Sequence, residues 1–441
     1  MTSVRGHLAA SSMWAFGGFA TLAVSSVVVN AVLTRAMSPP AVGVYFLAVS
    51  VVTFAATVGR AGMNQSVVRL IARAEAAHGL PAAGVAVRTV LAVAVLTAAS
   101  ASLVLGLFAL RPLALTVFDS PRLAQLGLLL GFWCFVEALR LVASEALRGF
   151  GRIGAATVLG DAGRQVLFGA AVSVALVATG RLSVALVVAC AIAAGAVVLL
   201  VALLLLRSTA SHRSSETPPA ALATLQLSVP MMVTALSALA VTQGDVWLAG
   251  IVLSDAHVGI YAATARLILL VVFPLHISNV VLSPVIARLH ARGSLKELQH
   301  TVRMGATAAA LPTLAIVSVL LLFGGPILGL VYGDAYRDGA SALRILAGGQ
   351  LVNALVGSCG QVLLMTGQHK VMMKVTLLAG LLFFPIGALA TWRFGLVGLA
   401  SASALTTAGS NVALWILVRR RLGIWTHGAL RDGYRHEVAS A

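Results

Sequence analysis

Charged residues are scarce in this sequence. Asp, Glu, Lys and Arg make up 10% of its 441 residues, whereas 60% of the residues are hydrophobic. Because soluble domains carry about 25% charged residues, this composition indicates an integral membrane protein. The chain has three cysteines, all in apolar segments and without the spacing of metal ligands, which argues against disulfides and against a zinc site.

Catalytic motifs are absent as well. The sequence contains no glycine-rich phosphate loop, no His-Glu-x-x-His pair and no nucleophile elbow. No long loop carries the paired acids that a membrane glycosyl-transfer enzyme would need. We therefore expect a protein that is not an enzyme and that has no cofactor and no metal site.

The net charge of +17 raises the question of a nucleic-acid partner. The sequence has no basic patch interleaved with aromatic residues and no soluble domain to carry one, so we expect no nucleic-acid binding. The basic residues are better explained as signals that orient membrane helices.

Twelve apolar segments are long enough to span a membrane, six on each side of a polar stretch rich in Ser, Thr and Pro. They lie near residues 11–34, 41–59, 84–108, 123–147, 153–179, 182–206, 223–253, 256–282, 303–325, 340–366, 371–391 and 395–418. The sequence thus predicts an all-α polytopic membrane protein. Its predicted parts are an N-terminal six-helix lobe (1–207), a cytoplasmic linker (208–222), a C-terminal six-helix lobe (223–418) and a basic cytoplasmic tail (419–441).

The distribution of Lys and Arg predicts the orientation. With alternate loops on opposite faces, 20 of the 30 bases lie on the face that holds both termini, 7 lie on the other face and 3 lie within the membrane. Positive charge accumulates on the cytoplasmic side, so both termini are predicted to be cytoplasmic.

Similar short sequence motifs recur along the chain at a nearly constant offset. Ser38-Pro-Pro-Ala-Val-Gly-Val-Tyr45 matches Ser254-Asp-Ala-His-Val-Gly-Ile-Tyr261 at an offset of 216, and Ile71-Ala-Arg73 matches Ile286-Ala-Arg288 at 215. A constant offset of about half the chain indicates two duplicated halves. Because six helices per half is an even number, both halves enter the membrane from the same side and form parallel repeats.

Two charged residues flank the second copy of this loop. Asp245 and Arg266 each lie about 15 Å along a helix from the loop, near the middle of a hydrocarbon core about 30 Å thick. A buried arginine there needs a partner or a wet cavity, and Asp245 is the nearest candidate partner. Asp245 has two alternative roles: it holds Arg266 until a phosphate competes for it, or it binds H+ or Na+ for coupling.

Two further acid and base pairs fall in the fourth and fifth apolar segments. Glu137 with Arg140, and Asp161 with Arg164, are each spaced i, i+3 and share a helix face. One interpretation is that these ion pairs fix helix packing without contact with substrate. The other is that Arg140, Arg164 and Arg266 bind substrate phosphate in a cavity while Asp245, Glu137 and Asp161 serve coupling or gating.

Neutral polar residues within the predicted spans form a third set of candidates. Each either lines a cavity or makes a hydrogen bond between helices. They are Asn30, Gln243, His276, Asn279, Gln350, Asn353 and Gln361.

The sequence resembles the polysaccharide flippases of the MATE-like superfamily, and most of all the bacterial O-antigen and exopolysaccharide transporters of the Wzx type. The likeness is carried by Leu33-Thr-Arg-Ala-Met-Ser-Pro-Pro-Ala-Val-Gly-Val-Tyr45, Gly62-Met-Asn-Gln-Ser-Val-Val-Arg-Leu-Ile-Ala-Arg73, Asp245-Val-Trp-Leu-Ala-Gly250 and Val258-Gly-Ile-Tyr261. It covers essentially the whole chain.

The resemblance implies alternating access, in which two lobes move an undecaprenyl-pyrophosphate oligosaccharide across the bacterial cytoplasmic (inner) membrane. It implies a role in lipopolysaccharide O-antigen or exopolysaccharide synthesis, beside a polymerase and a chain-length regulator as partners, and we expect a monomer. A multidrug cation antiporter and a lipid II flippase are the alternatives within the superfamily.

Overall fold

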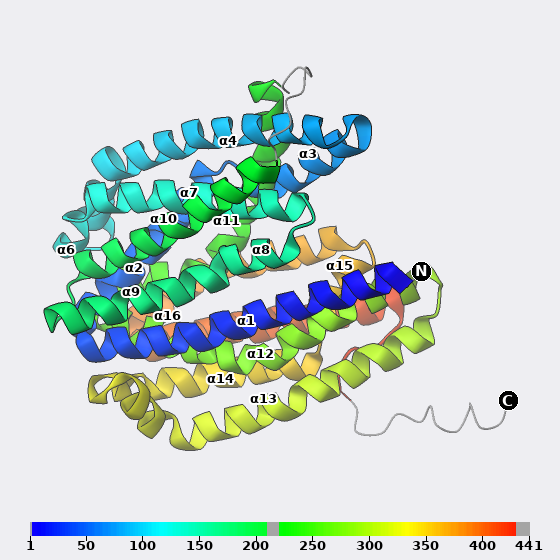
Figure 1. Cartoon of the computed structure of the whole chain (residues 1–441). Coiled ribbons are helices and arrows are strands. Elements are labelled where there is room, and N and C mark those ends of the chain that lie inside the picture. The colour runs from blue at the N-terminus through cyan, green and yellow to red at the C-terminus, as the bar shows by residue number, and fades with distance from the viewer. Residues whose placement is uncertain (1, 210–219, 429–441) are drawn as a thin grey trace. The chain divides into compact units, whose positions relative to one another are not determined.

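The computed structural model describes residues 2–209 and 220–428, and every regular element in these ranges is a helix (Figure 1). The predicted linker therefore lies mostly outside the described residues, as do the last 13 residues of the predicted basic tail. The prediction of an all-α polytopic protein is confirmed: eleven helical segments among the described residues are long and apolar enough to cross a membrane.

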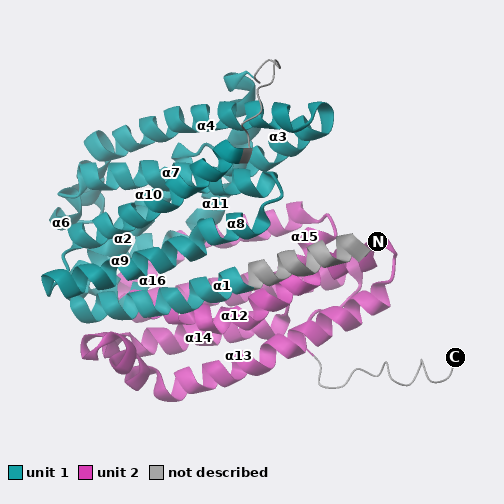
Figure 2. Ribbon diagram, viewed as in Figure 1, with its two compact units in different colours: residues 1–262 teal, residues 263–441 magenta. Residues whose placement is uncertain are grey.

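The chain packs as two compact units, residues 1–262 and 263–441 (Figure 2). The helices of unit 1 are α1 (Thr2–Ala36), α2 (Pro39–Gly59), α3 (Met63–His78), α4 (Leu80–Leu103), η1 (Val104–Ala109), α5 (Leu110–Pro112), η2 (Leu113–Val117), α6 (Pro121–Ala124), α7 (Gly127–Gly149), α8 (Ile153–Thr157), η3 (Val158–Ala162), α9 (Gly163–Thr179), α10 (Val184–Thr209), α11 (Ala221–Val252) and the first two turns of α12 (Asp255–Ala291). Unit 2 holds the rest of α12, then α13 (Leu295–Tyr332), η4 (Asp334–Gly339), α14 (Ala340–Val356), α15 (Cys359–Met365) and α16 (His369–Leu422).

Two of the predicted spans meet at a bend, and another is interrupted. The segments 371–391 and 395–418 both lie within α16, where the chain bends at Gly395, whose φ of +57° favours glycine. The segment 340–366 is interrupted, because α14 ends at Val356 and Gly357 takes a φ of +78° before α15 begins. The count of twelve spans and the cytoplasmic placement of both termini stay predictions.

The boundary between the compact units lies after residue 262, not at the predicted linker. The reason is that α11 packs against α2, α3 and α4. Within that contact Ser66 and Ser228 hydrogen-bond through their side chains, with 2.6 Å between the two Oγ atoms. The two six-helix lobes, which follow from the sequence repeat, stay a prediction.

Two repeat-related glycines allow α2 and α12 to cross closely within unit 1. A Cβ on Gly43 would collide with the carbonyl of Asp255, and a Cβ on Gly259 would collide with the carbonyl of Pro39. Gly43 and Gly259 are 216 residues apart, and so are their contact partners Pro39 and Asp255. Each copy therefore makes the same contact with the other. Such self-complementary contacts are typical of two copies related by a two-fold axis, which supports the repeat.

Unit 2 has its own apolar core. Fully buried side chains of α12, α13, α15 and α16 form it, including Ile286, Val302, Val362 and Val418. Ile424, which follows α16, packs against the same core and ties the chain after that helix to unit 2.

Candidate functional site

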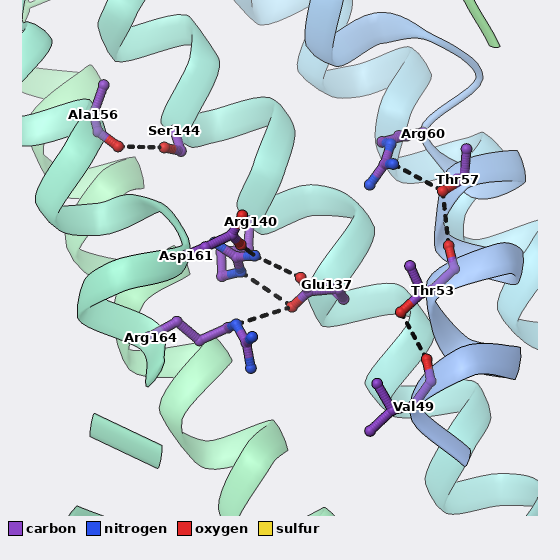
Figure 3. A network of polar contacts seen from close by, with 10 residues as sticks. All are labelled: Val49, Thr53, Thr57, Arg60, Glu137, Arg140, Ser144, Ala156, Asp161 and Arg164. Atoms are coloured by element: carbon purple, nitrogen blue, oxygen red, sulfur yellow. Dashed lines mark hydrogen bonds and ion pairs between the residues drawn. The ribbon is translucent and has the colours of Figure 1, made fainter. Parts of the chain in front are cut away.

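Four charged side chains gather inside unit 1 (Figure 3). Arg140 is fully buried and donates to Glu137 through Nε (3.1 Å to Oε2) and Nη2 (2.5 Å to Oε1). The same Nη2 donates to Asp161 Oδ1 at 2.7 Å. Arg164 approaches from the opposite side, with its Nε 4.0 Å from Glu137 Oε2. These residues form the charge cluster, which brings together the charged residues of the fourth and fifth apolar segments.

Local structure explains how the two helices present these groups. Along α7, Glu137 and Arg140 are three residues apart and so share a helix face. Asp161 lies in the π-helical segment η3, directly after Gly160, whose ψ of −146° breaks the helical path. Such π segments occur often at functional sites. The break leaves the Asp161 side chain 54% exposed even though it pairs with buried Arg140.

The charge cluster has unused hydrogen-bonding capacity. Arg140 Nη1 and Arg164 Nε are buried and make no hydrogen bond to the described residues. Arg60, directly after α2, also has a buried Nε that makes no hydrogen bond to the described residues. It lies within electrostatic range of Glu137 and Asp161. The charge cluster itself pairs two arginines with two acids, and Arg60 adds a positive charge outside it. Buried donors without partners are costly, so this arrangement is suited to an added anion.

Sequence reasoning missed Arg60, which it placed among the bases of the cytoplasmic face. In the structure its Nη2 donates to the Thr57 hydroxyl at 2.8 Å, and Thr57 in turn donates to the Thr53 carbonyl at 2.7 Å (Figure 3). Arg60 stands apart from the charge cluster in this view. The signal that could have found it is its place directly after an apolar run, within reach of an intramembrane acid.

Asp245 has a partner that the sequence did not indicate. The Tyr261 hydroxyl donates to Asp245 Oδ2 at 3.0 Å, and the backbone N–H of Val246 donates to Oδ1 at 2.8 Å. Both partners belong to unit 1. Tyr261 is fully buried, so its hydroxyl fixes the carboxylate of a half-buried acid.

Arg266 lies on α12 in unit 2 and is half-buried. It is within electrostatic range of Tyr332, whose buried hydroxyl makes no hydrogen bond to the described residues. The predicted pair of Arg266 with Asp245 joins the two units and stays a prediction.

The neutral candidates fall into separate places. In unit 1, Asn30 is buried and donates to the Ser26 carbonyl of its own helix at 2.7 Å, while Gln243 is half-buried on α11. In unit 2, Asn353 donates to Gln350 Oε1 at 3.0 Å. The structure therefore joins Gln350 to Asn353 and leaves Asn30 bonded within α1.

Two more of these candidates are linked through a serine. Gln361 Nε2 donates to Ser283 Oγ at 2.5 Å, and Ser283 donates to the Asn279 carbonyl at the same distance. His276 is half-buried on the same helix as Asn279. Among the residues that the structure describes, no three His, Cys, Asp or Glu side chains come together as a metal site.

Comparison with solved structures defines the fold. The fold is similar to that of an inward-facing multidrug resistance MATE family transporter of the MOP superfamily, with a TM-score of 0.74, 14% identity and coverage of 91% of this chain and 94% of the other. It is also similar to the lipid II flippase MurJ in an inward closed conformation, with a TM-score of 0.73, 14% identity and coverage of 93% and 87%. The protein is a multi-pass membrane protein with the MATE-like fold.

The family follows from the sequence match. The model of the polysaccharide biosynthesis protein family matches residues 12–290, and the MatE model matches residues 230–389. The chain belongs to the polysaccharide biosynthesis protein family. A probable low-salt glycan biosynthesis flippase, Agl15 of Haloferax volcanii, is 23% identical over 168 residues, which are 38% of this chain and 36% of that relative.

Proposed function

We propose that this protein moves a lipid-linked oligosaccharide, carried on undecaprenyl pyrophosphate, across the bacterial cytoplasmic membrane for the synthesis of a cell-surface polysaccharide. The family match and the glycan flippase relative support a glycan cargo. The observation that carries the proposal is the charge cluster inside unit 1, in which buried N–H groups of Arg140 and Arg164 make no hydrogen bond to the described residues. A pyrophosphate is the anionic part of such a cargo.

Arg164 is the arginine best placed to bind this anion. Its ion pair with Glu137 is long, at 4.0 Å, whereas Arg140 is held by two carboxylates at 2.5 and 2.7 Å. A phosphate can therefore recruit Arg164 without breaking a short ion pair. Arg140 then keeps Glu137 and Asp161 in place while the anion binds.

The test is translocation of a fluorescent undecaprenyl-pyrophosphate oligosaccharide in proteoliposomes that contain the wild type or Arg164→Ala. A hydrogen bond to a charged group contributes about 1.5–3 kcal/mol, so we expect transport at low substrate concentration to fall about 10- to 100-fold. Arg164→Lys, which keeps the charge, is expected to recover part of the loss.

Arg148→Ala is the matched control. Arg148 follows on α7, pairs with Glu145 at 3.5 Å and is 48% exposed. Exposed pairs of this kind contribute less than about 1 kcal/mol, so its removal is expected to leave transport within about twofold of the wild type. If the wild type and a folded Arg164→Ala variant transport the cargo equally well, Arg164 does not bind the anion of the cargo.

The MatE match to residues 230–389 favours a second candidate, a multidrug cation antiporter. The same proteoliposomes, loaded with a cationic dye and given a proton or sodium gradient, separate the two functions. Dye export without glycan transport would establish the antiporter and overturn the flippase proposal.

A further inference from the structure

An apolar groove of about 410 Å³ opens in the side of unit 1, within the membrane-spanning segments. Its walls are residues 51–58 of α2, the end of α4 with η1 and η2, and the Trp247 to Ile251 turn of α11. All twelve lining residues are aliphatic or aromatic. Phe54, Val104 and Ile251 are 42%, 54% and 51% exposed, so the groove is open to its surroundings.

Aromatic rings are concentrated in this groove. Three of its twelve lining residues are aromatic, Phe54, Phe118 and Trp247, whereas aromatic residues make up 6% of the chain. Phe54 and Trp247 meet edge to face with their ring centroids 5.5 Å apart, and they connect α2 to α11. The groove thus offers flat rings between aliphatic walls.

The α4 wall of the groove departs from regular helix. The segments η1 and η2 are both π-helical, and they supply Val104, Leu105, Ala109 and Leu113 to the lining. Such π segments appear frequently at functional sites. Two of them lie on this wall of the groove.

We propose that this groove binds the polyisoprenoid tail of the lipid-linked cargo while the pyrophosphate and sugar are transported. The proposal rests on the function proposed above. A cargo whose polar head passes between the two halves of a transporter must leave its tail in lipid at a seam between them. The groove lies at such a seam, because α2 and η1 come from the first sequence half and α11 from the second.

Size and shape agree with this ligand. At roughly 30 Å³ for each carbon-sized group, which is about the volume of a liquid water, the groove holds about a dozen groups, or two to three isoprene units. A branched, unsaturated chain presents methyl groups and flat double bonds to the rings of Phe54 and Trp247. Preference over a straight acyl chain must come from this packing, because burial from lipid supplies no hydrophobic driving force.

The direct test is photolabelling of the full-length protein in liposomes with a polyisoprenyl pyrophosphate that carries a diazirine in its tail. We expect labelled peptides from residues 51–58 and 101–113. Ala55→Trp, which fills the groove, is expected to lower this labelling about fivefold. Ala175→Trp makes the same change on α9, outside the groove, and is expected to leave labelling unchanged.

A transport measurement adds a readout specific to the tail. In Ala55→Trp the KM for a full-length cargo is expected to rise about tenfold, while a cargo with a single five-carbon isoprene unit, which leaves most of the groove empty, is transported much as in the wild type. Retained transport of the short-tailed cargo also shows that the variant is folded. Equal effects on both cargoes would overturn the proposal.

A control lipid distinguishes a groove that binds the polyisoprenoid tail of the cargo from one that is filled by the acyl chains of membrane lipid. A phosphatidylcholine with a diazirine in its acyl chain is used at the same mole fraction. If it labels the groove as strongly and is not displaced by polyisoprenyl pyrophosphate, the groove holds membrane lipid and the proposal fails. Labelling by the polyisoprenyl probe without glycan transport would overturn the proposed function alone, and glycan transport without such labelling would overturn the groove alone.

Discussion

Tyr45 and Tyr261 occupy equivalent positions in the two repeats, two residues after Gly43 and Gly259, but their surroundings differ. The ring of Tyr45 stacks between Trp133 and Phe168, at centroid distances of 6.5 and 6.2 Å. Tyr261 instead donates its hydroxyl to Asp245.

The preceding helices differ in the same way. The first repeat has Asn30 within a residue of the position that corresponds to Asp245, and Asn30 is bonded to its own helix. The backbone contact between the repeats has stayed reciprocal, whereas the acid and its tyrosine occur in the second repeat. The two copies thus share the backbone contact and differ in the polar side chains around it.

The largest expected effect comes from placing an acid in the first repeat. Asn30→Asp puts a carboxylate beside the Ser26 carbonyl at a site that is 5% exposed. A buried charge without compensation costs about 3–5 kcal/mol, so we expect a markedly lower thermal unfolding midpoint in detergent.

The converse change is the control. Asp245→Asn keeps an oxygen that accepts the hydrogen bond from the Tyr261 hydroxyl. We therefore expect the free energy of unfolding to fall by only about 1 kcal/mol. Equal losses in Asn30→Asp and Asp245→Asn would contradict the difference between the two repeats.

The next effect concerns the contact that the repeats share. Gly43→Ala and Gly259→Ala each push a Cβ into a backbone carbonyl and are expected to cost about 2–3 kcal/mol, at the upper end for overpacking. Gly348→Ala on α14 meets nothing within 4 Å and is expected to be neutral or stabilising by up to about 1 kcal/mol. Unfolding midpoints of the three variants check this, and tolerance of either Gly43→Ala or Gly259→Ala would show that the contact is not reciprocal.

The smallest effect isolates the tyrosine hydroxyl. Tyr261→Phe removes one bond to half-buried Asp245, and we expect a loss of about 1 kcal/mol. Tyr336→Phe is the matched control, because the buried Tyr336 hydroxyl makes no hydrogen bond to the described residues. A double-mutant cycle of Tyr261→Phe with Asp245→Ala measures the coupling free energy between the two side chains. A coupling near zero would contradict the hydrogen bond between Tyr261 and Asp245.

Much of the fold could be predicted from local sequence pattern. The apolar segments are helices in the structure, and the i, i+3 spacing of Glu137 with Arg140 predicted that both lie on one helix face. The sequence did not predict the break at Gly357, because hydropathy averages over a window and does not register a single change of backbone angle.

The candidate site was predicted less completely. Glu137, Arg140, Asp161 and Arg164 were identified because charge is rare in apolar segments. Arg60 was missed, because its position at a helix end resembles a topology signal.

The sequence by itself determined the membrane class, the helical segments, the repeat and the intramembrane charges, since composition and periodicity are properties of the chain alone. The tertiary structure decided which groups meet: Arg140 with two acids, Asp245 with Tyr261, and α2 with α11 around an apolar groove. The physical reason is that partners are set by the rotation and contact of neighbouring helices, and these depend on packing between residues that are far apart in the chain.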